Sequence, residues 1–305
     1  QAAFQLTQNV HFLWLIVLFP LLGAAINGIA GKKIQDRFGK KANHAIAVGA
    51  MIASSLVALF AFLVKILPAD PGARVLVDRV FPMIHVGSLH VDFSLLMDQL
   101  SGTMTLIITL IGTGIHIYSV GYMATEKAYW RFFSYMNLFV FAMLLLVLGD
   151  SFILMFFGWE GVGLCSYLLI GFWYTDFAKA TAGMKAFVVN RIGDFAFISG
   201  LFLLFWGMGG AWTTTGQYVQ ERAHTIQVER VDPGHLEEAE GPAEAVHGEA
   251  AVIGAGMATH ERFDIRVGPT VSFHELAQQM AITDEDHERP VAKALAEKTV
   301  WGLPI

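Results

Sequence analysis

The 305-residue chain is 55% hydrophobic and only 15% charged, with a mean hydropathy of +0.53. Soluble domains carry about 25% charged residues, so this chain must contain long uncharged stretches of the kind that cross membranes. Cys165 is the only cysteine and cannot form a disulfide within the chain, which excludes a disulfide-stapled secreted fold. With 20 basic against 26 acidic residues, the chain has no overall basic surface, which excludes a nucleic-acid binder.

The charge is unevenly spread along the chain. Residues 1–207 hold 13 Lys and Arg against 10 Asp and Glu, whereas residues 208–305 hold the remaining 7 against 16. We therefore expect three parts: a short extramembrane segment at 1–9, a transmembrane bundle at 10–207, and an acidic, water-facing loop or insertion at 208–305 that leads to a further span. The chain begins at Gln1 and ends in an apolar approach at 300–305, and we expect it to be a fragment.

Six stretches are long and apolar enough to cross a bilayer, which takes roughly 20 residues per helix. They lie at about 10–30, 45–67, 94–118, 132–149, 152–174 and 180–207. Three alternate connections carry an excess of Lys and Arg: Lys32 to Lys41 in the first, Lys127 and Arg131 in the second, and Lys179 in the third. By the positive-inside rule these connections are cytoplasmic, so both ends of the chain are predicted on the periplasmic side of the inner membrane.

Two regions outside the spans have distinct patterns. Residues 73–93 alternate apolar and polar side chains around a suitable turn at Gly87-Ser88, which predicts a small periplasmic β-hairpin. Residues 217–268 contain few large apolar side chains and the acidic run 237–244, so we expect them to fold poorly on their own. Short amphipathic helices are predicted at 273–280 and 289–299.

Five ionisable residues lie within the predicted spans, where each charge costs about 2.5–3.5 kcal/mol or more, so each is a functional candidate: Asp98, Glu160, Lys185, Arg191 and Asp194. Glu160 is the strongest. If its helix begins near Ser151, it lies roughly 13 Å along that helix, near the middle of the membrane. Burial favours its neutral form and a nearby cation its charged form, a balance that suits a proton relay; a permanently paired or neutral structural Glu is the alternative.

The other four charges leave more than one interpretation open. Arg191 and Asp194 are three residues apart on one helix face, so they can neutralise each other as a structural pair or act in function. Lys185 lies on another face and needs a partner elsewhere, or reaches toward the cytoplasmic end of its helix. Asp98, at the outer start of the third span, is a candidate helix cap or a functional group.

Other chemistries have little support. Among the histidines of the spans only His116 lies deep in the sequence, where a hydrogen-bonded structural role is the usual one, so a haem site is not predicted. The six histidines of the acidic tail show no metal-ligand spacing, and no nucleophile–base pattern is recognisable.

Four segments resemble a known family: 97–101, 116–119, 158–171 (GWEGVGLCSYLLIG) and 184–194 (MKAFVVNRIGD). They are similar to the antiporter-like proton-pumping subunits of respiratory complex I, of the bacterial L and mitochondrial subunit 5 type. The resemblance covers roughly 10–212 and resumes at 270–276. It implies an all-α polytopic bundle of about fourteen core helices, built as two inverted five-helix repeats, of which this chain covers the first six.

The resemblance also implies roles for the charged residues. In the family, the Glu that matches Glu160 pairs with a Lys on the broken seventh helix, which is expected beyond Ile305, and switching of that pair moves protons. Arg191 and Asp194 match positions near that Glu, and Lys185 matches another charged position. The stretch 217–268 is longer than the family's usual loop, which favours a lineage-specific insertion.

The predicted function is proton translocation by a membrane subunit of NADH:quinone oxidoreductase, coupled to electron transfer in other subunits. The resemblance implies no cofactor or metal in this chain, with NAD, FMN, iron–sulfur clusters and quinone held by other subunits. Its expected partners are other complex I membrane subunits, lipid and protons. A subunit of a multi-subunit Na⁺/H⁺ antiporter or of a membrane-bound hydrogenase is the nearest alternative. A non-transporting membrane scaffold is the alternative from another class.

Overall fold

The computed structural model describes residues 7–69, 74–86 and 89–207, together with five short strands farther along the chain. These residues belong to two units, which are described separately. The first unit comprises Thr7–Phe81 and Phe93–Ile198, and the second comprises Gln1–Leu6, Pro82–Asp92 and Ser199–Ile305. The first unit carries the membrane helices, apart from the end of α6 after Ile198, and every charged residue that the sequence singled out.

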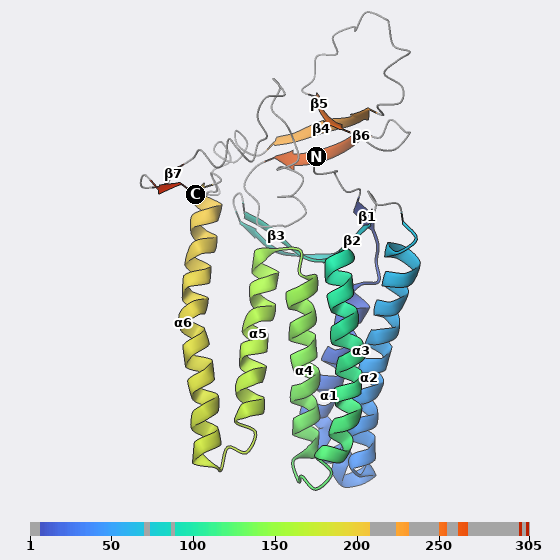
Figure 1. The fold of residues 1–305 in the computed structure, drawn as a ribbon, viewed down its shortest axis with the longest axis vertical. Helices are drawn as coiled ribbons and strands as arrows, with labels where there is room; N and C mark the ends of the chain where they lie inside the picture. Colours follow the sequence, from blue (N-terminus) through green and yellow to red (C-terminus); the bar gives the residue numbers. More distant parts are fainter. Residues whose placement is uncertain are drawn as a thin grey trace, which may run out of the picture. The chain divides into compact units, whose positions relative to one another are not determined.

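Six helices of the described part are long and apolar enough to cross a membrane, and Figure 1 shows them as upright rods. This confirms the prediction of an all-α polytopic bundle with six spans. After Phe60 the second helix widens into a π-helical turn, η1 (Ala61–Ile66), in which the N–H of Leu67 donates to the carbonyl of Phe62, five residues earlier, at 2.9 Å. The helices are α1 (Trp14–Phe38), α2 (Lys40–Phe60), α3 (Gln99–Tyr122), α4 (Tyr129–Leu148), α5 (Phe152–Ile170) and α6 (Phe177–Gly207).

The first predicted connection differs from the structure. The basic residues between Lys32 and Lys41 were expected in a loop, but they lie on the ends of α1 and α2, and Gly39 alone separates the two helices. Gly39 has a φ of 78°, a left-handed conformation that costs glycine little and lets the chain reverse at a single residue. Helix α1 therefore continues through the basic residues for about two turns beyond the apolar stretch from which the span was predicted.

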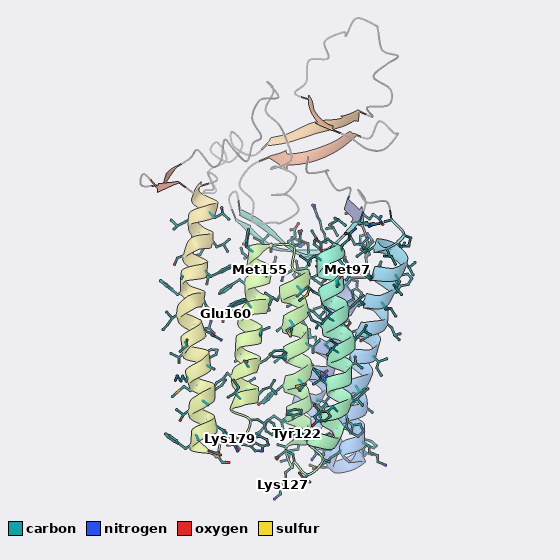
Figure 2. The ribbon with its side chains drawn as sticks, in the orientation of Figure 1. Met97, Tyr122, Lys127, Met155, Glu160 and Lys179 are labelled. Carbon is teal, nitrogen blue, oxygen red and sulfur yellow. The ribbon has the colours of Figure 1, made fainter. Side chains whose placement is uncertain are left out.

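The basic connections do gather at one end of the helices, called here the Lys127 end; Figure 2 labels Tyr122, Lys127 and Lys179 there. Lys40 Nζ donates to the carbonyl of Ala124 at 2.7 Å, which ties the start of α2 to the α3–α4 connection. Gln35 Nε2 donates to the carbonyl of Lys127 at 3.0 Å and ties the end of α1 to the same connection. The three connections thus share one side, as the charge pattern predicted, while the assignment of that side to the cytoplasm stays a prediction.

A three-stranded sheet lies at the opposite, Met97 end. Its order is β1 (Thr7–Asn9), β2 (Val75–Val86) and β3 (Leu89–Met97), and β1 pairs in parallel with β2 from Thr7↔Val75 to Asn9↔Val77. Neighbouring β2 and β3 agree with the predicted hairpin, but the third strand was not predicted. Because β3 occupies the residues up to Met97, α3 begins at Gln99 rather than near 94 as predicted.

Helices α1 to α4 enclose the apolar core of the first unit, which consists of two clusters. The larger cluster lies toward the Met97 end and includes fully buried Leu13, Ile16, Leu76, Leu95 and Leu144. The smaller cluster includes Ala47, Met123, Tyr129, Phe133 and Phe172. The α1–α4 helices therefore form a packed body against which α5 and then α6 are added.

In the second unit, three strands form a separate sheet with the order β5 (Ala250–Gly254), β4 (His224–Val231) and β6 (Arg262–Val267). The expectation that 217–268 folds poorly on its own stays a prediction, although the described part of this stretch contains these three strands. In the antiparallel β4–β6 register, Ile226 pairs with Ile265 and Val228 with Phe263. The short strands β7 (Thr299–Val300) and β8 (Leu303–Pro304) pair farther on. The predicted helices at 273–280 and 289–299 lie outside the described residues, except that Thr299 begins β7.

Candidate functional site

Helix α5 packs one face against α4 and carries Glu160 on the face toward α6. Ser151 caps the start of α5 by accepting a hydrogen bond from the N–H of Leu154 at 3.1 Å. On one face, a Cβ atom at Gly158 would overlap the backbone of Leu146, and one at Gly161 would lie 2.9 Å from the Cβ of Ala142. These glycines let α5 approach α4 closely, which leaves Glu160 directed away from α4 and toward α6.

Glu160 forms an ion pair with Arg191 of α6 (Figure 2 labels Glu160 between the two helices). The Glu160 side chain is 19% exposed and the Arg191 side chain is 48% exposed. Nε of Arg191 also lies 3.9 Å from Oδ2 of Asp194, whose side chain is only 8% exposed. The structure thus brings Glu160, Arg191 and Asp194 together, with one guanidinium between two carboxylates.

Two further side chains complete this site and were not predicted as members of it. Trp159 Nε1 donates to Oδ1 of Asp194 at 2.8 Å, and the guanidinium of Arg191 lies 4.7 Å from the ring centroid of Phe187. The sequence did contain a signal for Trp159. Trp159 lies next to Glu160 in the sequence, and its indole N–H can only donate a hydrogen bond. It was therefore a candidate donor to a second carboxylate within the membrane.

The charge balance of the site allows it to hold a proton. With both carboxylates ionised, Glu160, Asp194 and Arg191 together carry one net negative charge, and Asp194 is close enough to repel the charge on Glu160. A net charge within a membrane span is costly, and one proton on either carboxylate removes it.

The remaining two candidates lie apart from this site. Asp98 caps α3: its Oδ1 accepts from the N–H of Ser101 at 2.7 Å, and the Ser101 hydroxyl accepts from the N–H of Asp98 at 2.8 Å. This agrees with the capping alternative left open by the sequence. Lys185 lies exposed on α6, and within the described part of the chain it forms no ion pair with Glu160 or Asp194.

A latch of aromatic and charged side chains at the Lys127 end determines where α6 begins. Trp173 Nε1 donates to Oε2 of Glu126 at 3.0 Å, and Nη2 of Arg131 donates to the carbonyl of Phe172 at 3.2 Å. The Arg131 guanidinium also lies 4.8 Å from the Phe172 ring centroid and 5.2 Å from that of Tyr174. The α5–α6 connection is therefore tied to the α3–α4 connection, which fixes the first residues of α6.

The latch also determines the ionisation of its carboxylates, which lie outside the membrane spans. The hydrogen bond from Trp173 is the main cause that holds the pKa of Glu126 below its ordinary value, aided by the backbone N–H of Ala128. The hydrogen bond from Lys179 is the main cause that lowers the pKa of Asp176. Both side chains are thus ionised at neutral pH, as the latch requires.

Two family models match this chain where the site residues lie. Residues 83–133 match the N-terminus of chain 5 of NADH-ubiquinone oxidoreductase (complex I), and residues 149–228 match the transmembrane domain of the NADH:quinone oxidoreductase/Mrp antiporter family. The second match contains Glu160, Arg191 and Asp194. In these two regions the chain is similar to the antiporter-like subunits of complex I.

Relatives agree with this assignment. Subunit L of NADH-quinone oxidoreductase from Mycobacterium tuberculosis is 46% identical over 65% of this chain and 30% of its own length. Subunit L from Rickettsia bellii is 42% identical over 61% of this chain and 28% of its own length. Chain 5 of NADH-ubiquinone oxidoreductase from Dictyostelium citrinum is 41% identical over 62% of this chain and 27% of its own length. The chain spans about 30% of the length of the curated relatives it matches.

A solved structure supports the fold. The structure of the membrane-bound sulfane sulfur reductase, an archaeal respiratory membrane complex, aligns with a TM-score of 0.51 at 17% sequence identity. The alignment covers 66% of this chain and 38% of that chain. Together with the six apolar helices, these similarities make the chain a multi-pass membrane protein of the antiporter-like fold.

Proposed function

We propose that this chain is the N-terminal part of a proton-translocating membrane subunit of NADH:quinone oxidoreductase, and that Glu160 is the carboxylate whose protonation changes during transport. The observation that carries the proposal is the arrangement of Glu160, Arg191 and Asp194, two carboxylates around one guanidinium between two membrane-spanning helices. Two carboxylates that share one cation hold a proton more readily than either carboxylate alone beside it.

In the proposed cycle the residues of this chain move only the proton and take no part in electron transfer. Glu160 takes up a proton when Arg191 moves toward Asp194, and releases it when Arg191 returns. Trp159 holds Asp194 in place through its hydrogen bond. Electron transfer from NADH to quinone, with NAD, FMN, iron–sulfur clusters and quinone, belongs to other subunits in this proposal. The names of the relatives as subunits of NADH-quinone oxidoreductase support it.

The energies involved are compatible with such a switch. Moving one elementary charge against 100 mV costs about 2.3 kcal/mol. One pKa unit corresponds to about 1.36 kcal/mol, so a change in proton affinity of about two pKa units is sufficient. Loss of a charged partner at a buried carboxylate produces changes of that size.

The test is NADH-driven proton uptake in inverted membrane vesicles that contain the full-length subunit, with NADH oxidation measured in parallel. Glu160→Gln removes the titratable group but keeps its size, and we expect proton uptake to fall at least about tenfold, since general acid–base groups contribute roughly 10²-fold or more. Glu126→Gln is the matched control, because Glu126 is a carboxylate of the latch outside the spans, and its uptake should stay near that of the wild type. Assembly of the complex is checked for both variants.

The outcomes separate the candidate functions. Normal proton uptake in Glu160→Gln would reject Glu160 as the switch and favour a scaffold role. Proton uptake that depends on a Na⁺ gradient rather than on NADH oxidation would favour the Na⁺/H⁺ antiporter alternative. The description of the matched family model includes the Mrp antiporter. A hydrogenase subunit would instead couple uptake to hydrogen chemistry and would not respond to NADH.

A further inference from the structure

Two pairs of aromatic rings join α5 to α6, one on each side of the proton site. Toward the Lys127 end, the rings of Tyr167 and Phe187 have their centroids 5.6 Å apart. Toward the Met97 end, Phe156 stacks on Phe197, also at 5.6 Å. The charged residues of the site lie between these two pairs on both helices. The pairs therefore differ in which of them can act on those charges.

In the described part of the chain, Phe187 is the ring of these four that lies against a charge of the site. The guanidinium of Arg191 is 4.7 Å from its centroid, within the distance of about 6 Å at which a cation is attracted to an aromatic face. Phe187 precedes Arg191 by four residues, so the two side chains are neighbours on one face of α6. The ring thus attracts the guanidinium toward the Lys127 end.

Asp194 attracts the same guanidinium in the opposite direction along α6. It follows Arg191 by three residues, whereas Phe187 precedes it by four. Nε of Arg191 lies 3.9 Å from Oδ2 of Asp194, close to the limit of about 4 Å for an ion pair, while Nη1 contacts Glu160. The position of the guanidinium therefore depends on a balance in which Phe187 and Glu160 together oppose Asp194.

Packing does little to hold the guanidinium in place. The Arg191 side chain is nearly half exposed. Within the described residues it borders a groove of about 400 Å³, which is otherwise lined by Phe187, Val188, Ile192 and Phe195. A long side chain with space beside it takes the position that its attractive contacts favour, so the contact with Phe187 has a direct effect on where the charge lies.

Helix α5 holds the ring of Phe187 in turn. One turn before Phe187, Gly183 is buried, and a Cβ atom there would lie 3.2 Å from the carbonyl oxygen of Tyr167. This close approach brings α6 onto α5 at Tyr167, whose ring then lies beside the half-buried Phe187. The ring of Phe187 is therefore a fixed point, relative to which Arg191 can move.

We infer that Phe187 is a positioning residue of the proton switch: its ring holds the guanidinium of Arg191 beside Glu160, and Tyr167 holds that ring in place. This inference rests on the proposed role of Glu160 in proton translocation. In that role Glu160 takes up its proton when Arg191 moves toward Asp194, and the ring opposes this movement. A cation–π contact at a partly exposed site changes such an equilibrium by about fivefold.

The pH dependence of NADH-driven proton uptake tests this role, in inverted membrane vesicles that contain the full-length subunit in its complex. Phe187→Leu removes the ring but keeps an apolar side chain, so Arg191 spends less time beside Glu160. We expect the midpoint of the pH profile to shift by about 0.7 unit to higher pH, which is the fivefold change on the pH scale. Phe187→Tyr keeps the ring face and should restore the midpoint of the wild type.

Phe197→Leu is the matched control, because Phe197 also lies against a ring of α5 and no contact with Arg191 is found for it in the described part of the chain. Its midpoint should match that of the wild type. An unchanged midpoint in Phe187→Leu would overturn the inference, and so would an equal shift in Phe197→Leu or a failure of Phe187→Tyr to restore the midpoint. If Phe187→Leu does not assemble, Tyr167→Leu replaces it: a shift to higher pH supports the inference, and an unchanged midpoint overturns it.

Glu160→Gln in the same vesicles separates this inference from the proposed function. Loss of uptake in Glu160→Gln, together with a wild-type midpoint in Phe187→Leu, would overturn only the positioning role of Phe187. Normal uptake in Glu160→Gln would overturn the proposed function and the positioning role with it.

Discussion

Helix α4 and helix α6 are both apolar and long enough to span a membrane, yet they are held in the molecule in different ways. In their most apolar windows, 44% of α4 is buried and only 6% of α6 is buried. Helix α4 contacts α1, α3 and α5 through close-packed small and apolar residues. Helix α6 meets α5 through Arg191, Asp194 and stacked rings such as Phe156 and Phe197, whose centroids are 5.6 Å apart.

This difference shows that apolar composition does not decide packing in a membrane. Lipid is as apolar as leucine, so helices associate where small residues allow close approach or where polar groups find partners. Helices α1 to α5 combine both routes, since Asn43 and Ser134 also form hydrogen bonds between helices. In the described part of the chain, α6 meets α5 mainly through the ion pair of Arg191, the Trp159–Asp194 hydrogen bond and aromatic rings.

The largest expected effect comes from the close contact of α4 and α5. Gly158→Ala adds a methyl group that overlaps the backbone of Leu146, so we expect it to lower the free energy of unfolding by an amount near the top of the range of about 1–3 kcal/mol for overpacking. Unfolding in mixed micelles measures it. Gly163→Ala on the same helix is the control, since a Cβ there meets nothing within 4 Å, and it should be neutral or stabilising. Equal losses in both variants would show that the close contact at Gly158 is not what destabilises the variant.

A smaller effect is expected from the amide pair of α1 and α2. Asn43→Ala removes the donor to Oδ1 of Asn27 and to the carbonyl of Gly31, while Asn27 Nδ2 keeps its bond to the backbone carbonyl of residue 43; the lost bonds should cost about 1–3 kcal/mol of unfolding free energy. Asn190→Ala on exposed α6 is the matched comparison and should change stability by less than about 0.5 kcal/mol. The same unfolding measurement tests both. A larger loss for Asn190→Ala would mean that α6 is as tightly packed as α2.

The smallest effect concerns pH and the latch that fixes the start of α6. The pKa of Glu126 is lowered in the folded protein, chiefly by the hydrogen bond from Trp173. Its contribution to stability is therefore fully present above the ordinary carboxyl pKa and is lost as the pH falls through the lowered value. In Trp173→Phe this part of the acid dependence should shrink, as followed by thermal unfolding between acidic and neutral pH. An unchanged pH profile would show that the latch does not depend on the charge of Glu126.

Several elements could be predicted from the sequence because each depends on a local pattern. The six spans follow from apolar length, the β2–β3 pair from alternation around Gly87-Ser88, and the shared side of the three connections from their Lys and Arg. Asp98 at the start of α3 was recognisable as a candidate cap. The chain reversal at Gly39 was missed because the basic residues beside it were taken for a loop, although they continue α1 and α2.

The candidate site was predicted in part. Glu160, Arg191 and Asp194 were singled out because charges in membrane spans are costly, which is a property of each residue alone. Trp159 was missed because its role depends on Asp194, 35 residues away and on another helix. Lys185 was singled out by the same cost argument, but the structure places it apart from Glu160.

The sequence by itself determined which segments are apolar enough to cross the membrane, which charges lie within them and which family they resemble, since these depend on composition and motif. Only the tertiary structure decided that Arg191 lies between Glu160 and Asp194, and that Trp159 donates a hydrogen bond to Asp194. Such contacts depend on the rotation and depth of each helix relative to its neighbours. Those are set by glycine contacts and by the connections at the helix ends, because the surrounding lipid favours no particular orientation.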